Sequence, residues 1–181
     1  MQQEHLNFMK TLQHEMLTQD TDGQAAPRFW VIMDYEWQAT AEGYHDRVSV
    51  YDSSDGDACE IKEYATEIYN TQGDHYTKEA LEELSEIIKP DCVNESNLFD
   101  WIKNNVPGID IFFEEKVAVI KPNTLFLTKS EAQQHLKNNR HHYSKQAHTY
   151  AMTAWRSPQV EQLYEVIEQT DWEKVKAEIA L

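Results

Sequence analysis

Acidic residues gather in one stretch of this chain, and that stretch limits how the chain can fold. Between Asp34 and Glu115 there are 21 acidic and 5 basic residues, a net charge of −16 that equals the net charge of all 181 residues. Between Lys121 and Arg156 the balance reverses, with 6 basic residues and 1 acidic residue. Carboxylates are costly to bury, so helices in the acidic stretch need an apolar face to hold them to the rest of the protein.

The composition indicates a compact protein with a single domain over residues 1–181. Twenty aromatic rings supply a core, and intrinsic disorder is therefore excluded. No apolar run approaches the roughly 20 residues that span a bilayer, and the N-terminus lacks the pattern of a signal peptide. We expect a cytoplasmic protein with no membrane contact. Cys59 and Cys92 are expected to be separate thiols.

Hydrophobic spacing and capping residues predict the secondary structure. Helices are expected over 6–18, 58–69, 77–89, 97–103, 130–139, 158–169 and 172–180, and strands over 29–37, 47–52, 109–113, 116–120 and 124–128. The first two strands are expected to pair with each other, and the segment 141–155 is compatible with a helix toward its end. The fold class is α+β, a small mainly antiparallel sheet covered by several helices. Residues 1–20 form a peripheral amphipathic helix, and residues 121–181 form a basic-aromatic C-terminal module.

Carboxylates in the acidic stretch form the first candidate site, a partner-binding surface. Helical spacing places four of them on one face, with neighbouring Cβ atoms about 5–6 Å apart. The preceding loop and helix add six more. The ten residues are Asp52, Asp55, Asp57, Glu60, Glu63, Glu67, Glu79, Glu82, Glu83 and Glu86. This surface is either an ordinary solvated helix face or one that occupies a basic groove built for nucleic-acid phosphates.

Histidines and rings of the C-terminal module form the second candidate site, an alternative contact for nucleic acid. Its residues are His141, His142, Tyr143, His148, Tyr150, Trp155 and Arg156. Rings interleaved with basic groups are typical of a stacking surface for single strands, and a pair such as His142 with His148 would suit acid–base chemistry. The same rings could instead be core, with the basic groups at its rim or facing a second copy. Neither candidate site has the ligand spacing of a metal site, so we expect no metal and no cofactor.

Two segments resemble small proteins encoded by phages and prophages of Gram-positive bacteria: RFWVIMDYEW…HDRVSVYD and the tail over residues 123–173. The most specific part of the tail is HYSKQAHTYAMTAWRSP. The resemblance implies an anti-defence factor, such as an anti-CRISPR protein that blocks a Cas9-type nuclease, and it brings no catalytic residues. The first hypothesis is therefore a non-enzymatic acidic inhibitor of a basic nucleic-acid-binding host protein. The alternative is a protein that binds or processes RNA or single-stranded DNA. A third is a structural or regulatory partner whose acidity only confers solubility, and a homodimer is compatible with each.

Overall fold

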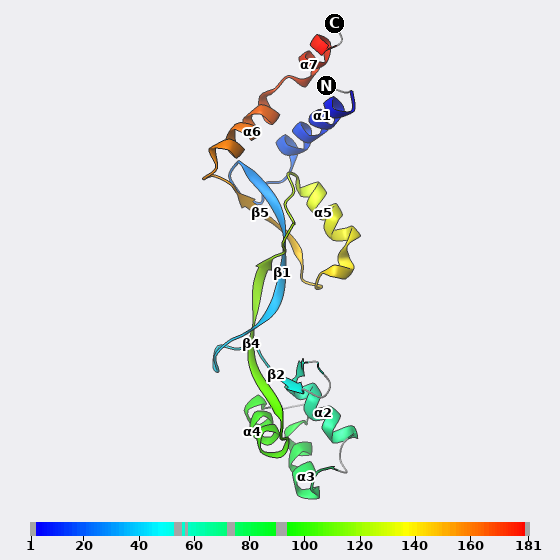
Figure 1. Ribbon diagram of the computed structural model, residues 1–181, viewed down its shortest axis with the longest axis vertical. Helices are drawn as coiled ribbons and strands as arrows, with labels where there is room; N and C mark the ends of the chain where they lie inside the picture. Colours follow the sequence, from blue (N-terminus) through cyan, green and yellow to red (C-terminus); the bar gives the residue numbers. More distant parts are fainter. Residues whose placement is uncertain (1–2, 53–55, 57, 72–74, 90–93, 180–181) are drawn as a thin grey trace. The chain divides into compact units, whose positions relative to one another are not determined.

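The computed structural model describes residues 3–52, 56, 58–71, 75–89 and 94–179 (Figure 1). It confirms the α+β class, with a five-stranded sheet in the order β3-β2-β4-β1-β5. The strands are β1 (Arg28–Ala39), β2 (Arg47–Asp52), β3 (Ala58–Glu60), β4 (Ile109–Ile120) and β5 (His148–Thr153). The helices are α1 (Gln3–Thr18), α2 (Ile61–Thr71), α3 (Lys78–Ile87), α4 (Glu95–Asn105), α5 (Lys129–Asn138), α6 (Pro158–Gln169) and α7 (Trp172–Ile179). Of the described helices, none is long and apolar enough to cross a membrane.

Backbone contacts divide the chain into two compact units, which are described separately here. Unit 1 comprises residues 1–36 and 118–181, and unit 2 comprises residues 37–117. The boundary therefore falls inside β1 and inside β4. The N-terminal helix and the C-terminal module, which the sequence prediction treats as separate parts, belong to the same unit.

Three helices and a sheet enclose the core of unit 2. Val48 and Val50 of β2 are buried against α2, α3 and α4, where Leu84, Leu98 and Ile102 are fully buried. α3 begins where the sequence predicts, because the Thr77 side chain accepts a hydrogen bond from the backbone N–H of Ala80. α4 is capped in the same way by Asn94. Trp101 Nε1 donates to the Ala80 carbonyl at 3.0 Å, which joins α4 to α3.

Unit 1 has two small cores. Leu12 and Met16 of α1 pack against Tyr164 and Ile167 of α6, so the N-terminal helix is built into the unit rather than peripheral to it. α5 covers one face of β1 and β5, where Ala132 packs with Trp30 and Ala151. Thr128 accepts from the N–H of Glu131, as expected for the predicted capping pattern.

Strand pairing differs from the prediction because β4 lies between β1 and β2. The expected strands 109–113 and 116–120 are one continuous strand. Glu114, in its middle, lies opposite Arg47, and the two side chains form an ion pair at 2.8 Å, which makes an acidic residue tolerable inside the strand. The expected strand 124–128 is wrong, since the structure has only an isolated bridge between Phe126 and Trp30 there.

Two strands were missed in the sequence. β5 lies within the segment expected to be compatible with a helix, and it pairs along β1 from Met33↔His148 to Arg28↔Thr153. β3 replaces the first turn of the helix expected from residue 58 and pairs with β2. β5 depends on pairing with a strand far away in the sequence, and β3 has only three residues. Local periodicity therefore detects neither strand.

Candidate functional site

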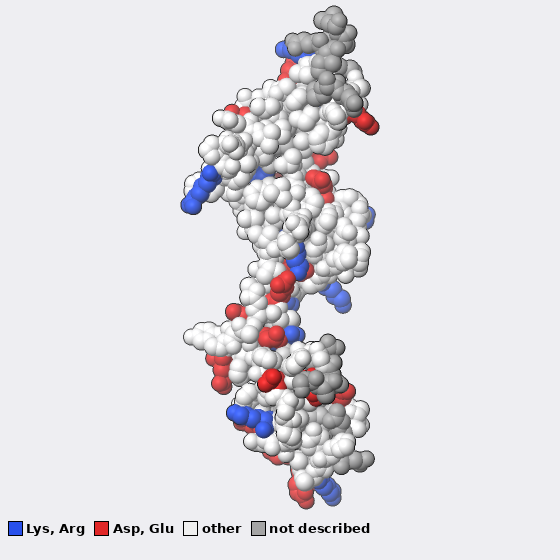
Figure 2. Space-filling view, viewed as in Figure 1, with Lys and Arg blue, Asp and Glu red and all other residues white. Residues whose placement is uncertain are grey.

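Charge is distributed very unequally between the two units. Unit 2 contains 19 acidic and 6 basic residues, whereas unit 1 contains 13 acidic and 10 basic residues. The acidic stretch of the sequence therefore corresponds closely to one structural unit. Figure 2 shows acidic side chains in red and basic side chains, lysine or arginine, in blue on the visible surface.

Four carboxylates predicted to share one face of α3 all lie exposed, and these are Glu79, Glu82, Glu83 and Glu86. Two of them have cationic neighbours close in the sequence: Glu82 pairs with Lys78 of α3 at 3.6 Å, and Glu86 pairs with Lys89, just beyond the end of α3, at 2.5 Å. Exposed pairs of this kind contribute only about 0.3–0.5 kcal/mol and open easily. Glu79 and Glu83 form no ion pair with any residue that the structure describes, so the helix surface stays negative.

A groove between α3 and α4 brings in groups that the sequence prediction missed. Glu83 and Glu86 line one side of this groove, whose volume is about 580 Å3, and the polar side chains of α4 line the other side. The latter are Asn97, Asp100, Asn104 and Asn105. Asn97, Asp100 and Asn104 are spaced three and four residues apart, so the sequence could have predicted that they share one face of α4. The groove offers carboxylates and amide groups, which suit a guanidinium or ammonium group.

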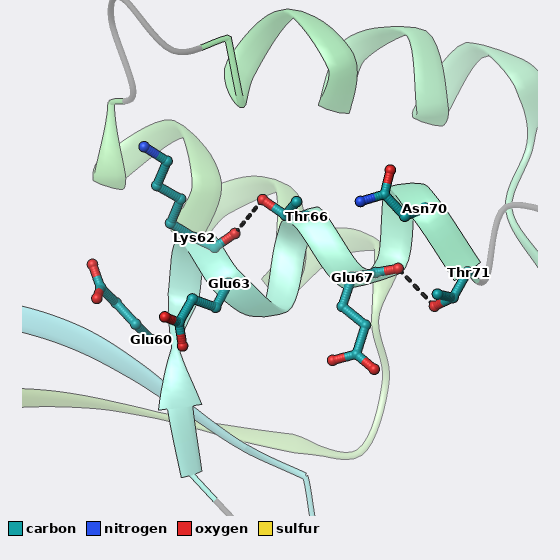
Figure 3. Close-up of a pocket in the computed structure, with 7 residues that line it drawn as sticks. All are labelled: Glu60, Lys62, Glu63, Thr66, Glu67, Asn70 and Thr71. Atoms are coloured by element: carbon teal, nitrogen blue, oxygen red, sulfur yellow. Dashed lines mark hydrogen bonds between the residues drawn. The ribbon is translucent and has the colours of Figure 1, made fainter.

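The helix α2 carries a second, shallow hollow of about 600 Å3 (Figure 3). The carboxylates of Glu63 and Glu67 extend to the same side of α2, and both residues are exposed. The hydroxyls of Thr66 and Thr71 donate to backbone carbonyls of their own helix at 2.7 Å. The carboxylates, together with Glu60 at the end of β3, are thus the charged acceptors that remain for a partner.

Asp52, although predicted to be part of the acidic surface, is half-buried. Its carboxylate accepts a hydrogen bond from the Tyr64 hydroxyl at 3.2 Å. Burial, and then this bond to a carboxylate, raise the pKa of Tyr64. Asp52 therefore links β2 to α2 and is only partly accessible to a partner. Asp55 and Asp57 lie outside the described residues.

Asp34, the first residue of the acidic stretch, is also internal, being only 2% exposed. It accepts hydrogen bonds from the backbone N–H groups of Tyr35 at 2.8 Å and Ser144 at 3.1 Å, and from the Ser144 hydroxyl. Burial alone would raise the pKa of Asp34, but these donors outweigh burial and hold the pKa below its ordinary value. Asp34 fastens the segment before β5 to β1 and is not a binding residue.

The histidine and aromatic residues of the second candidate site belong to unit 1 and do not all lie on its surface. His141 and His142 are exposed in a short 3-10 turn, with ring centroids 4.0 Å apart. Tyr143 is half-buried, and its hydroxyl is 2.8 Å from His135 Nε2, so it is better placed to hold this turn to α5 than to meet a ligand. His148, Tyr150, Trp155 and Arg156 are exposed. Among the residues that the structure describes, no three His, Cys, Asp or Glu side chains are grouped to hold a metal ion.

Comparisons of the chain with models of known protein families, with curated proteins and with solved structures found no match. The resemblance to phage proteins therefore stays a prediction. The function proposed below is therefore inferred from the chemistry of the exposed side chains.

Proposed function

We propose that this chain is a phage-encoded anti-defence protein, an acidic inhibitor whose unit 2 binds a basic nucleic-acid-binding protein of the host, such as a Cas9-type nuclease. One observation carries the proposal. Exposed carboxylates on α2 and α3, including Glu63, Glu67, Glu79 and Glu83, form no ion pair with a described residue. They are therefore available to the cations of another protein.

Binding of this kind follows the physics of nucleic-acid clefts. Such clefts concentrate Lys and Arg to meet a duplex that carries one charge per roughly 1.7 Å of its axis. Carboxylates repeated along a helix at neighbouring turns offer a comparable row of anions. A protein that occupies the cleft excludes the nucleic acid without needing catalytic residues.

The groove between α3 and α4 adds a specific contact to this general attraction. Arginine guanidinium groups bind carboxylates through paired hydrogen bonds, and amide oxygens accept the remaining protons. Glu83, Glu86 and Asp100 supply the carboxylates, and Asn97 and Asn104 supply the amides. An arginine that reads DNA in a host nuclease has the chemistry that this groove accepts.

Affinity capture from a Gram-positive host lysate tests the proposal, first at low and then at high salt. We expect the chain to retain a basic nucleic-acid-binding protein that duplex DNA displaces and that high salt releases. Inhibition of target cleavage by a purified Cas9-type nuclease then tests the specific target. Recovery of only acidic or neutral proteins, or of a partner that duplex DNA does not displace, would contradict the proposed function.

A further inference from the structure

We propose that unit 1 carries a second binding surface, on the side of β1 and β5 opposite to α5, and that this surface binds single-stranded nucleic acid. The inference goes beyond the function proposed for unit 2 and does not depend on it.

Strand register defines this surface. Residues that lie opposite each other in an antiparallel pair point to the same side of the sheet, and successive residues alternate between sides. Ala151 lies opposite Trp30, and both pack under Ala132 of α5. The opposite side, which we term the open sheet face, therefore consists of Phe29, Val31, Met33 and Tyr35 of β1 with His148, Tyr150 and Met152 of β5.

Four of the seven side chains on the open sheet face carry rings, and none of the seven is a carboxylate. His148 and Tyr150 are exposed, and the rings of Phe29 and Tyr35 are half-buried. Tyr150 is 42% exposed, although its cross-strand neighbour Val31 is buried. The rings of Tyr35 and His148 lie 6.2 Å apart, which extends the aromatic surface across both strands. Bases stack on such rings because every base has a π-face, and each stacked base contributes about 1–3 kcal/mol.

Cations flank β5 at both ends. At its start, Arg140 is fixed by donating to the Ala147 carbonyl at 3.0 Å, and Lys145 is exposed beside it. Beyond its end, the Arg156 guanidinium lies 4.3 Å from the centre of the Trp155 ring. None of these three cations forms an ion pair with a residue in the described part of the chain. In a single strand, the bases can stack on the rings while the phosphates pair with the cations. An apolar protein segment would leave the cations unpaired.

The length of the strand sets the size of the ligand. A six-residue strand such as β5 spans about 17–20 Å, which accommodates two or three stacked bases. A duplex keeps its base faces stacked inside, so only a single strand can use these rings. Compared with the second candidate site of the sequence, this surface omits His141, His142 and Tyr143. It gains Met152 of β5 and four residues of β1, which are Phe29, Val31, Met33 and Tyr35.

Fluorescence anisotropy with a short labelled single-stranded oligonucleotide, at moderate salt, tests the inference on the full chain. Tyr150→Ala is expected to weaken binding roughly tenfold, as loss of one stacking ring predicts. Tyr69→Ala is the matched control, because Tyr69 is 44% exposed and belongs to unit 2. It should change the affinity less than about twofold, well below the loss of one stacked base. Arg156→Gln should make the affinity less dependent on salt. The slope of log affinity against log salt concentration should fall by about the contribution of one phosphate contact.

Three results would overturn the inference: no binding of the oligonucleotide by the unaltered chain, equal losses for Tyr150→Ala and Tyr69→Ala, or equal affinity for a duplex of the same length. Replacing Glu63, Glu67, Glu79 and Glu83 with Gln separates this surface from the one on unit 2. That variant is expected to lose the basic protein partner and to keep the oligonucleotide, so failure of one proposal is distinguishable from failure of the other.

Discussion

Unit 1 and unit 2 use the same kinds of elements but place their acidic residues differently. In unit 1, carboxylates hold the chain together: Asp34 binds the segment around Ser144, and Lys129 binds both Asp20 and Asp22. In unit 2, most described carboxylates of α2 and α3 point to solvent and make no such contacts. Several acidic residues of unit 1 therefore hold its loops in place, whereas most of those on α2 and α3 of unit 2 are available for binding.

The difference shows where stability comes from in each unit. Like charges spaced three and four residues apart slightly destabilise a helix, so the carboxylates of α3 do not stabilise unit 2. Its helices are held by the buried cluster around Leu84, Leu98 and Ile102. The carboxylates of α2 and α3 therefore add surface charge without stabilising their helices.

The largest expected effect comes from deleting a core side chain in each unit. Leu84→Ala in unit 2 and Ile167→Ala in unit 1 remove side chains that are 0% and 3% exposed, and each should cost about 2–5 kcal/mol of unfolding free energy. Hydrogen exchange should accelerate in α2, α3 and α4 for the first variant, and in α1 and α6 for the second. If both variants accelerate exchange in both units equally, the chain behaves as the single domain that its sequence predicts.

An intermediate effect is expected at Asp34. Asp34→Asn should lower the unfolding free energy at neutral pH by about 1–3 kcal/mol, because it weakens charged hydrogen bonds in a buried site. The folded-state pKa of Asp34 lies below its ordinary value of 3.8, so the stabilisation is complete above that pH and is lost as the pH falls through the lower, folded-state pKa. Urea unfolding should therefore show that the difference in unfolding free energy between Asp34→Asn and the unaltered chain becomes smaller in acid.

Asp46→Asn is the control for that measurement. Asp46 accepts from the Lys116 N–H at 2.8 Å, but it is exposed and belongs to unit 2. Its replacement should cost less than about 1 kcal/mol, because water can replace the lost bond. Equal losses at Asp34 and Asp46 would remove the distinction between internal and surface carboxylates.

The smallest effect is expected at the two lysines that pair with carboxylates of α3. Lys78→Gln with Lys89→Gln removes the ion pairs of Glu82 and Glu86 and should change the unfolding free energy by less than about 0.5 kcal/mol. Binding of a basic partner should stay the same or strengthen, because the two lysines no longer compete with the partner's cations for Glu82 and Glu86. Weaker binding would indicate that the lysines, and not the carboxylates, meet the partner.

Local signals in the sequence predicted much of the fold. The caps at Thr77 and Thr128, and Asp171, which accepts from the N–H of Lys174 at 3.1 Å, were all predicted because a cap depends on residues three positions away. Strand neighbours were not predicted, since β4 reaches β1 and β2 from far along the chain. β5 resembled a helix because its alternation is weak, and only its pairing with β1 makes it a strand.

The candidate sites were predictable to a similar degree. Helical spacing placed Glu79, Glu82, Glu83 and Glu86 on an exposed face, where the structure has them. The burial of Asp34 and the partial burial of Asp52 come with contacts to Ser144 and Tyr64, which no local sequence pattern predicts. Of the open sheet face, the sequence indicated only His148 and Tyr150. The residues of β1 were missed because the sequence did not indicate that β1 pairs with β5.

The central claim, that unit 2 binds through its own carboxylates, is tested most directly by two variants that remove the same number of charges. One replaces Glu63, Glu67, Glu79 and Glu83 of unit 2 with Gln, and the other replaces Glu4, Glu131, Glu161 and Glu165 of unit 1, which are also exposed. Calorimetry against the partner recovered from the lysate should show the first variant at least about tenfold weaker, a loss of about 1.4 kcal/mol, and the second weaker by less than about twofold. Equal losses for both variants would mean that only the overall charge matters, and the account of a binding surface on unit 2 would be wrong.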